Sequence, residues 1–244
     1  MMPYDLKNFE LSDMTKCGAA LRVAGEQAGS MQEVAEGVVR YLYDHLLDDT
    51  GTRSCVLVRL FLTLPYAQLN SDLRLFGDRL MDGHQLTPDT KCLTLLATIG
   101  EDPAWNSPRN SVGHQAIPLP SEHVIDEIPM ISQLIRQFGL DASTVLRPDP
   151  KLLLEIDQKK YNVFHVPEAR GSTFIPAQES FVIPHDVRSV LGYGGMLPTG
   201  NMFAVLMFTR VEVPHNTAEM FRTAALNTKL ALLPFLHGTI FSAT

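Results

Sequence analysis

The chain has 244 residues, of which 45% are hydrophobic and 19% are charged, so it is long enough to bury a sizeable core. Its net charge of −7 and its lack of a basic run argue against nucleic-acid binding, which depends on clustered lysines and arginines. Because no apolar run approaches the roughly 20 residues of a membrane helix and no secretory signal begins the chain, we expect a cytoplasmic protein without membrane contact.

The N-terminal region predicts two helices. Residues 14–28 are mildly amphipathic and are interrupted by two glycines. Ser30 and Glu33 form a capping box, and apolar residues at helical spacing then continue through residue 47. We therefore expect a second, more strongly amphipathic helix directly before the first strand.

The next segments alternate between strands and helices. Ser54–Leu64 is apolar on both faces except for one arginine, which predicts a covered strand, and a short helix follows over residues 69–80. Cys92–Ile99 predicts another strand. Gly100–Ser121 has no regular pattern and contains four prolines and the only tryptophan, as is typical of an insertion or a functional loop.

The middle of the chain is less regular. We expect a helix that Ser121 caps, with Pro129 in a helical first turn and Gly139 at the end. Residues 148–158 are compatible with further helical turns. A strand is expected over Tyr161–Val166, and Pro167–Pro184 is again irregular.

Val187–Leu236 has the clearest secondary-structure pattern, because two apolar strand segments joined by a turn precede a helix. The second strand is apolar on both faces, which predicts a central position in the sheet. Glycines around Tyr193 in the first strand indicate a bulge or a close backbone approach rather than a phosphate loop. We expect a capping box of Asn216 and Glu219 to start the helix and Pro234 to end it.

The order of these elements predicts an α/β (α+β) fold with a central antiparallel sheet, the terminal helices on one face and irregular segments over the other. No repeat and no linker rich in Pro, Gly or Ser divides the chain. We expect a single domain over 1–244, with a core of about 20–236 and an irregular insertion at about 100–121.

Several segments resemble the GAF sensor family, and in particular the GAF-like regions found upstream of bacterial sensor histidine kinases. The segments that carry the resemblance are EVAEGVVRYLYDHL before SCVLVRLFL, RSVLGYGGMLPTGNMFAVLMFTRVEVP before the final helix, GHQAIPLPS, FHVPEA and FIPAQESFVIP. The resemblance implies a sheet of about six strands with a small-molecule pocket on one face, and dimers formed through the terminal helices. The cysteine-histidine dipeptide of bilin-binding members is absent, and no cyclic-nucleotide motif is evident.

A sheet face covered by irregular segments that carry aromatic residues is a typical place for a ligand cavity. We therefore predict a pocket with apolar walls and a few polar anchors. The candidate walls are Trp105, Phe164, Phe174, Phe181 and Tyr193, and the candidate anchors are Arg59, His165 and His185.

Arg59 has an unusual position for a charged residue, because it interrupts a strand that is apolar on both faces. An unpaired buried charge costs several kcal/mol, so the side chain needs a partner. It either pairs with a carboxylate such as Glu168, Glu179 or Asp186, which we favour, or holds an anionic ligand through its planar fork.

No histidine pair has the close spacing of a local metal site, and we expect no bound metal. His165 and His185 flank an irregular segment, where either could hold a haem iron, although a structural hydrogen bond is the more common role. No feature of the sequence identifies a cofactor.

An enzymatic alternative rests on cysteines. Some GAF-fold proteins reduce free methionine sulfoxide, and Cys55 and Cys92 could approach one another if their strands are neighbours. Both lie in apolar strands, where a buried thiol is the ordinary occupant.

We therefore expect a non-enzymatic sensory domain that binds a small molecule, signals as a homodimer and acts with a histidine kinase or other partner. The alternatives are the cysteine-dependent redox enzyme and a ligand-free protein-interaction module.

Overall fold

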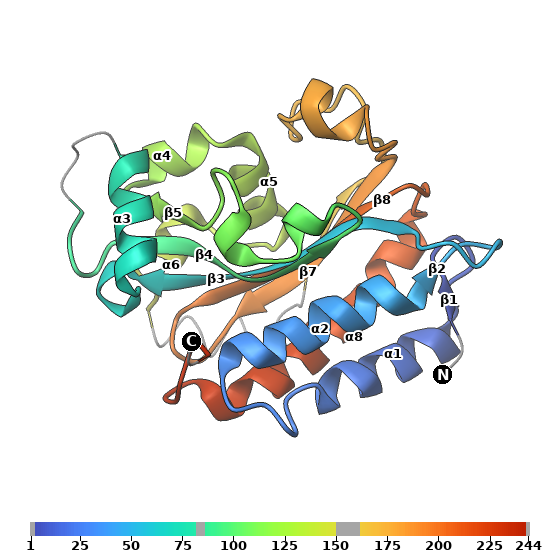
Figure 1. Ribbon diagram of the computed structural model, residues 1–244, viewed down its shortest axis with the longest axis horizontal. Coiled ribbons are helices and arrows are strands. Elements are labelled where there is room, and N and C mark those ends of the chain that lie inside the picture. Colours follow the sequence, from blue (N-terminus) through green and yellow to red (C-terminus); the bar gives the residue numbers. More distant parts are fainter. Residues whose placement is uncertain (1–2, 82–85, 150–161, 243–244) are drawn as a thin grey trace.

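The computed structural model describes residues 3–81, 86–149 and 162–242. Its main feature is a six-stranded, fully antiparallel sheet with the strand order β5-β4-β3-β8-β7-β6. Figure 1 shows long helices along one face of this sheet and shorter helices and loops over the other. The expected fold class is therefore confirmed, including the number of strands.

The strands of the sheet are β3 (Cys55–Pro65), β4 (Lys91–Gly100), β5 (Ala116–Leu119), β6 (Asn162–Val166), β7 (Ser189–Met196) and β8 (Met202–Thr209). The α-helices are α1 (Leu11–Val23), α2 (Met31–His45), α3 (Ser71–Leu80), α4 (Glu122–Asp126), α5 (Pro129–Gln137), α6 (Ala142–Leu146) and α8 (His215–Leu232). Two short strands, β1 (Tyr4–Asp5) and β2 (Leu46–Leu47), pair in parallel outside the sheet. Single turns of 3-10 helix occur at η1 (Tyr66–Gln68), η2 (Pro103–Trp105), η3 (Pro108–Asn110) and η5 (Leu233–Phe235). One turn of π-helix occurs at η4 (Gln178–Val182).

The helical layer contains α2 and α8, which pack directly on the sheet, and α1, which packs mainly on α8 (Figure 1). One half of the predicted capping box starts α2, because the Ser30 side chain accepts a hydrogen bond from the backbone N–H of Glu33. The other half does not form, since the Glu33 carboxylate accepts from the backbone N–H of Gly29 instead. The buried apolar side of this helix then joins the larger of two hydrophobic clusters. This layer buries one complete face of the sheet.

The opposite face carries a separate hydrophobic cluster beneath α4, α5, α6 and the segments 101–115 and 167–188. Ser121 caps α4, and Pro129 occupies the first turn of α5, as the sequence predicts. Gly139 follows α5 with a φ of 70°, a conformation that favours glycine. Short elements and loops, rather than long helices, therefore cover this face.

The C-terminal hairpin has the expected central position, because β8 lies between β3 and β7 and is buried along its whole length. The pairing of β7 with β8 shows no register shift, so the glycines of β7 do not form a bulge. They permit close packing instead. A Cβ atom on Gly194 would meet the Phe203 carbonyl and would lie 2.7 Å from the Phe138 ring.

Four sequence predictions need correction. The helix α8 begins at His215 after Pro214, and no capping box forms, because Asn216 already lies inside the helix. The expected irregular insertion contains the edge strand β5, and the helix expected over 14–28 lies at Leu11–Val23. The short helix α6 was missed.

The helical turns expected at 148–158 and the start of the strand at Tyr161 fall almost wholly outside the described residues. Among the helices that the structure describes, none is both long and apolar enough to cross a membrane.

Candidate functional site

An apolar cavity of about 380 Å³ lies between the sheet and its cover of short helices. Its floor comes from β3, β4 and β8, and its walls and roof come from α3, β5, α4, α5 and the segment before β5. The lining residues are Phe61, Leu80, Met81, Leu93, Gly113, His114, Ile117, Pro118, Val124, Ile128, Met130, Ile131, Leu134, Pro176, Ala204 and Leu206. The size and apolar character are those of a site for a small ligand.

Arg59 lies next to this cavity. It alternates with Leu57 and Phe61 on the face of β3 that carries the second cluster, and it stands opposite Leu206, a lining residue, in the register with β8. The residue is partly exposed, yet its Nε atom is buried and has no hydrogen-bond partner among the described residues. Burial lowers the pKa of Arg59 to about 10.

The favoured ion pair for Arg59 does not form. Asp186 is occupied by Arg170 and Arg188, with nitrogen–oxygen distances of 2.5 and 2.9 Å. Neither Glu168 nor Glu179 forms an ion pair with Arg59 in the described part of the chain. The prediction of a structural partner is therefore wrong, because the candidate carboxylates lie elsewhere or have other partners.

Thr98 and Ser111 also have buried hydroxyl groups without hydrogen-bond partners in the described residues. Thr98 pairs with Arg59 in the register of β3 with β4. Ser111 precedes Gly113 and His114 in the chain, and both of these residues line the cavity. The polar end of the apolar cavity is thus the place where His114, a lining residue, comes near Arg59 and Thr98 on the adjoining part of the sheet.

His114 adds a ring to this polar end. Its Nδ1 atom lies 3.0 Å from the backbone oxygen of Val112, so the neutral ring donates there and leaves Nε2 as an acceptor. Although part of the residue is exposed, packing around the ring and the positive charge of Arg59 lower the pKa of His114. A neutral imidazole is therefore the favoured form at neutral pH.

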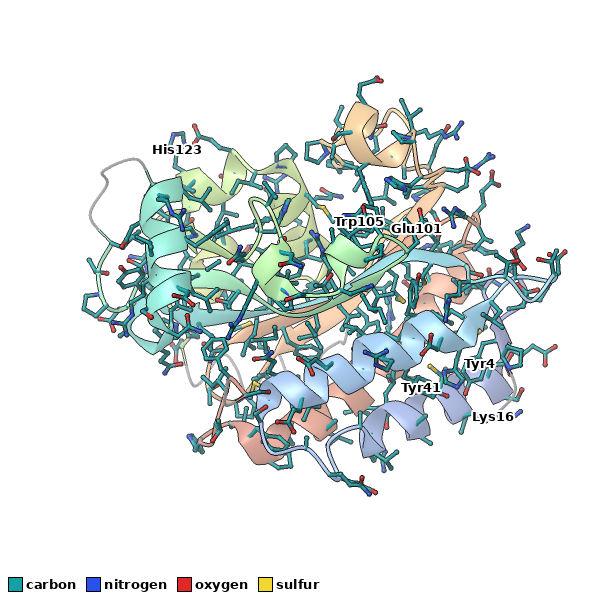
Figure 2. The ribbon with its side chains drawn as sticks, viewed as in Figure 1. Tyr4, Lys16, Tyr41, Glu101, Trp105 and His123 are labelled. Atoms are coloured by element: carbon teal, nitrogen blue, oxygen red, sulfur yellow. The ribbon has the colours of Figure 1, made fainter. Side chains whose placement is uncertain are left out.

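None of the eight predicted site residues lines this cavity directly. Trp105, Phe181 and His185 form an aromatic group near one end of the sheet, with ring centroids 4.8 to 5.6 Å apart. The His185 Nδ1 atom lies 2.7 Å from a carboxylate oxygen of Glu101, which also binds Arg210. Figure 2 shows Glu101 and Trp105 side by side on the face opposite α1 and α2. This group fastens the two irregular segments to the sheet.

The other predicted aromatic wall residues, Phe164, Phe174 and Tyr193, do not lie together around one space. Phe164 is fully buried in the second cluster, whereas Tyr193 lies in the first cluster on the other face, with its hydroxyl 3.2 Å from that of Thr228 in α8. Phe174 is 37% exposed. Because successive strand residues point to opposite faces, Phe164 and Tyr193 cannot share one pocket.

His165 lies in a separate, open groove of about 680 Å³ between β6 and α8. Its ring stacks on His215 at a centroid distance of 6.0 Å, and Gln137 binds its backbone N–H and carbonyl groups. Burial and the charge of His215 lower its pKa, although a hydrogen bond to the Val213 backbone opposes this. His165 and His185 therefore lie at different places, and the described residues contain no group of three metal-ligand side chains.

The cysteines do not form a redox pair. Cys92 pairs with Leu64 at one end of β3, whereas Cys55 lies at the other end, nine residues away or roughly 30 Å at strand rise. A disulfide needs Cα atoms within about 7 Å. Burial raises the pKa of each thiol to about 12, which disfavours the thiolate that reacts.

Sequence reasoning thus found Arg59 but missed the lining residues, including His114. The only signal for them was GHQAIPLPS, a segment of the family resemblance that now supplies Gly113, His114, Ile117 and Pro118 to the cavity.

No protein-family model matches the chain, and no curated protein matches it. Among solved structures, the photosensory core module of a phytochrome from Stigmatella aurantiaca is similar, with a TM-score of 0.39 and 11% sequence identity. The match covers 93% of this chain and 38% of that chain, so this chain spans less than half of the phytochrome module. A likeness this distant identifies neither a ligand nor a partner.

Proposed function

We propose that this chain is a GAF-like sensory domain that binds a small molecule and acts in signal transduction, without enzymatic activity of its own. In this proposal it works as a homodimer with a histidine kinase or another signalling partner. The sequence segments named above support the family assignment. The register that separates Cys55 from Cys92 removes the basis of the redox alternative.

The observation that carries the proposal is the cavity between the sheet and α5. Its lining is apolar, with Phe61, Leu93 and Ala204 on the sheet side and Ile131 and Leu134 on the helix side. Burial of a ligand there removes apolar surface from water, which is the main source of affinity in such sites. Short covering elements can also transmit occupancy to the surface.

A cavity-filling variant tests this function. Ile117 lines the cavity from the edge strand β5, where Ile117→Trp adds volume to the ligand space. The probe is 2-naphthamide, a neutral aromatic amide, with its dissociation constant measured by calorimetric titration. We expect saturable binding to the natural protein and at least tenfold weaker binding to Ile117→Trp.

The matched control is Ile183→Trp, since Ile183 is 46% exposed and does not line the cavity. It should bind the probe as the natural protein does. Unchanged affinity in Ile117→Trp, or absence of binding to the natural protein, would favour the ligand-free interaction module. Native mass spectrometry of freshly purified protein adds an independent readout, because a retained ligand increases the mass.

A further inference from the structure

We infer that the ligand of this cavity carries a carboxylate on an apolar body, and that Arg59 binds the carboxylate. This inference rests on the proposed function and adds the chemical class of the ligand to it.

Arg59 lies on β3 next to the cavity. Its neighbours along and across the strands, Phe61 and Leu206, both line the cavity. Arg59 is thus at the margin of the ligand space, on the same face of the sheet as these two residues. In this inference, the head group of a bound molecule extends from the cavity to the Arg59 guanidinium.

The described chain supplies no acceptor for the Arg59 Nε atom, although that atom is buried. The nearby loop carboxylates have other partners, since Glu101 binds His185 and Arg210 and Asp186 binds two further arginines. A buried polar group in a native protein normally has a partner. That partner is therefore water or a ligand.

Two buried hydroxyl groups are available at the polar end of the cavity, that of Thr98, which is across from Arg59 in the β3–β4 register, and that of Ser111, in the loop before His114. Thr98 and Ser111 are 6% and 7% exposed, and neither hydroxyl has a hydrogen-bond partner among the described residues. Hydroxyl groups can donate to an anion, so they complement the guanidinium. A carboxylate satisfies the planar fork with two parallel hydrogen bonds, which a single acceptor atom does not.

The polarity of the site differs from one end to the other. Beyond its polar end, the lining consists of aliphatic and aromatic side chains, methionines and prolines from the sheet, α3, β5, α4 and α5. A charged group there would lose hydration without a partner. The site therefore fits a ligand with charge at one end only.

The experiment compares 2-naphthoate with 2-naphthamide, two molecules of the same shape that differ in the charge of the head group. The quantity measured is the ratio of their dissociation constants in calorimetric titrations. We expect the natural protein to bind naphthoate roughly tenfold or more tightly than naphthamide, as charge-assisted hydrogen bonds predict. In Arg59→Met the preference should disappear.

Two further variants define the role of Arg59. Arg136→Met makes the same change on the solvent side of α5, where the Arg136 side chain is 68% exposed, and should keep the preference. Thr98→Val removes only the hydroxyl and should weaken naphthoate binding several-fold, which keeps the inference testable if Arg59→Met unfolds.

The outcomes separate this inference from the proposed function. Equal affinity of the natural protein for both probes, or a preference that persists in a folded Arg59→Met, would overturn the inference. If Ile117→Trp still blocks naphthamide in that case, the cavity and the proposed function stand. Unchanged naphthamide and naphthoate binding in Ile117→Trp would overturn both.

Discussion

Arg59 places a charge on β3, a strand that is mostly apolar on both faces. The sequence identifies it as a charge in an apolar strand, and no carboxylate among the described residues forms an ion pair with it. Burial lowers its pKa to about 10, below the value in the unfolded chain, so the charged form opposes folding at neutral pH.

We therefore expect Arg59→Met to raise the free energy of unfolding of the ligand-free protein by about 1–3 kcal/mol, because an apolar side chain replaces an unpaired charge. Urea unfolding measures the change. Arg136→Met should stay within about 0.5 kcal/mol of the natural protein, as is usual for exposed positions. Destabilisation by Arg59→Met would instead indicate a structural role for the arginine.

His165 predicts a dependence of stability on pH. Its pKa in the folded protein is lowered by burial and by His215, while Val213 and Glu219 act in the opposite direction. As the pH falls through about 6.5, the unfolded chain takes up the proton first, so the free energy of unfolding decreases. His165→Gln should make this decrease less steep between pH 7 and pH 5 in thermal or urea unfolding.

The control for this prediction is His237→Gln, because His237 is exposed near the C-terminus. It should leave the slope unchanged. A slope that is the same in His165→Gln and the natural protein would show that other groups cause the pH dependence.

At the scale of the elements, glycine has opposite roles in β7 and α2. Gly194 allows the Phe138 ring, which follows α5, to approach the sheet beside the cavity roof. Gly37 lies within α2, where an added Cβ would meet only ordinary contacts at 3.5 Å from Ala24. The same substitution at the two positions should therefore have opposite effects.

We expect Gly194→Ala to lower the free energy of unfolding by about 1–3 kcal/mol, because the new methyl group overpacks the sheet. Gly37→Ala should raise it by about 0.5–1 kcal/mol, through the better helix propensity of alanine. Both values come from urea unfolding. A tolerated Gly194→Ala would show that both the Phe203 backbone carbonyl and the Phe138 ring can move aside.

The elements that the sequence predicted well are those with long local patterns. The capping serine and apolar stripe of α2 and the doubly apolar β8 were identified correctly, because the spacing of apolar residues along the chain itself shows whether one face or both faces of the element are buried. The strand β5 was missed because it has four residues, one of them Pro118, in a proline-rich segment. Its strand conformation depends on pairing with β4, which no local pattern encodes.

At the scale of the whole molecule, the outer face of α1 is the place where the proposed homodimer would form. Leu11 and Val23 on this helix are 68% and 49% exposed, and Leu226 of the neighbouring α8 is 36% exposed. Figure 1 shows α1 as the outermost helix of its layer. Leu11 and Val23 lie at the two ends of α1, so in the proposed dimer each would contribute a separate apolar contact.

We expect a dimer by light scattering at micromolar concentration, and a shift to monomer in Val23→Glu, because a buried charge without a partner weakens an interface. Leu75→Glu provides the matched control, since Leu75 is 58% exposed on α3, away from the helical layer. A monomeric natural protein, or equal dissociation in both variants, would contradict the proposed dimer.

The sequence by itself determined the fold class, the central hairpin, the terminal helices and the anomaly at Arg59, because hydrophobic periodicity and caps act over a few residues. Only the tertiary structure decided which side chains share a space. It placed Tyr193 and Phe164 on opposite faces, separated Cys55 from Cys92 along β3, and brought His114 towards Arg59. The physical reason is that strand register and the packing of short loops arise from contacts between residues far apart in the chain, which no local pattern specifies.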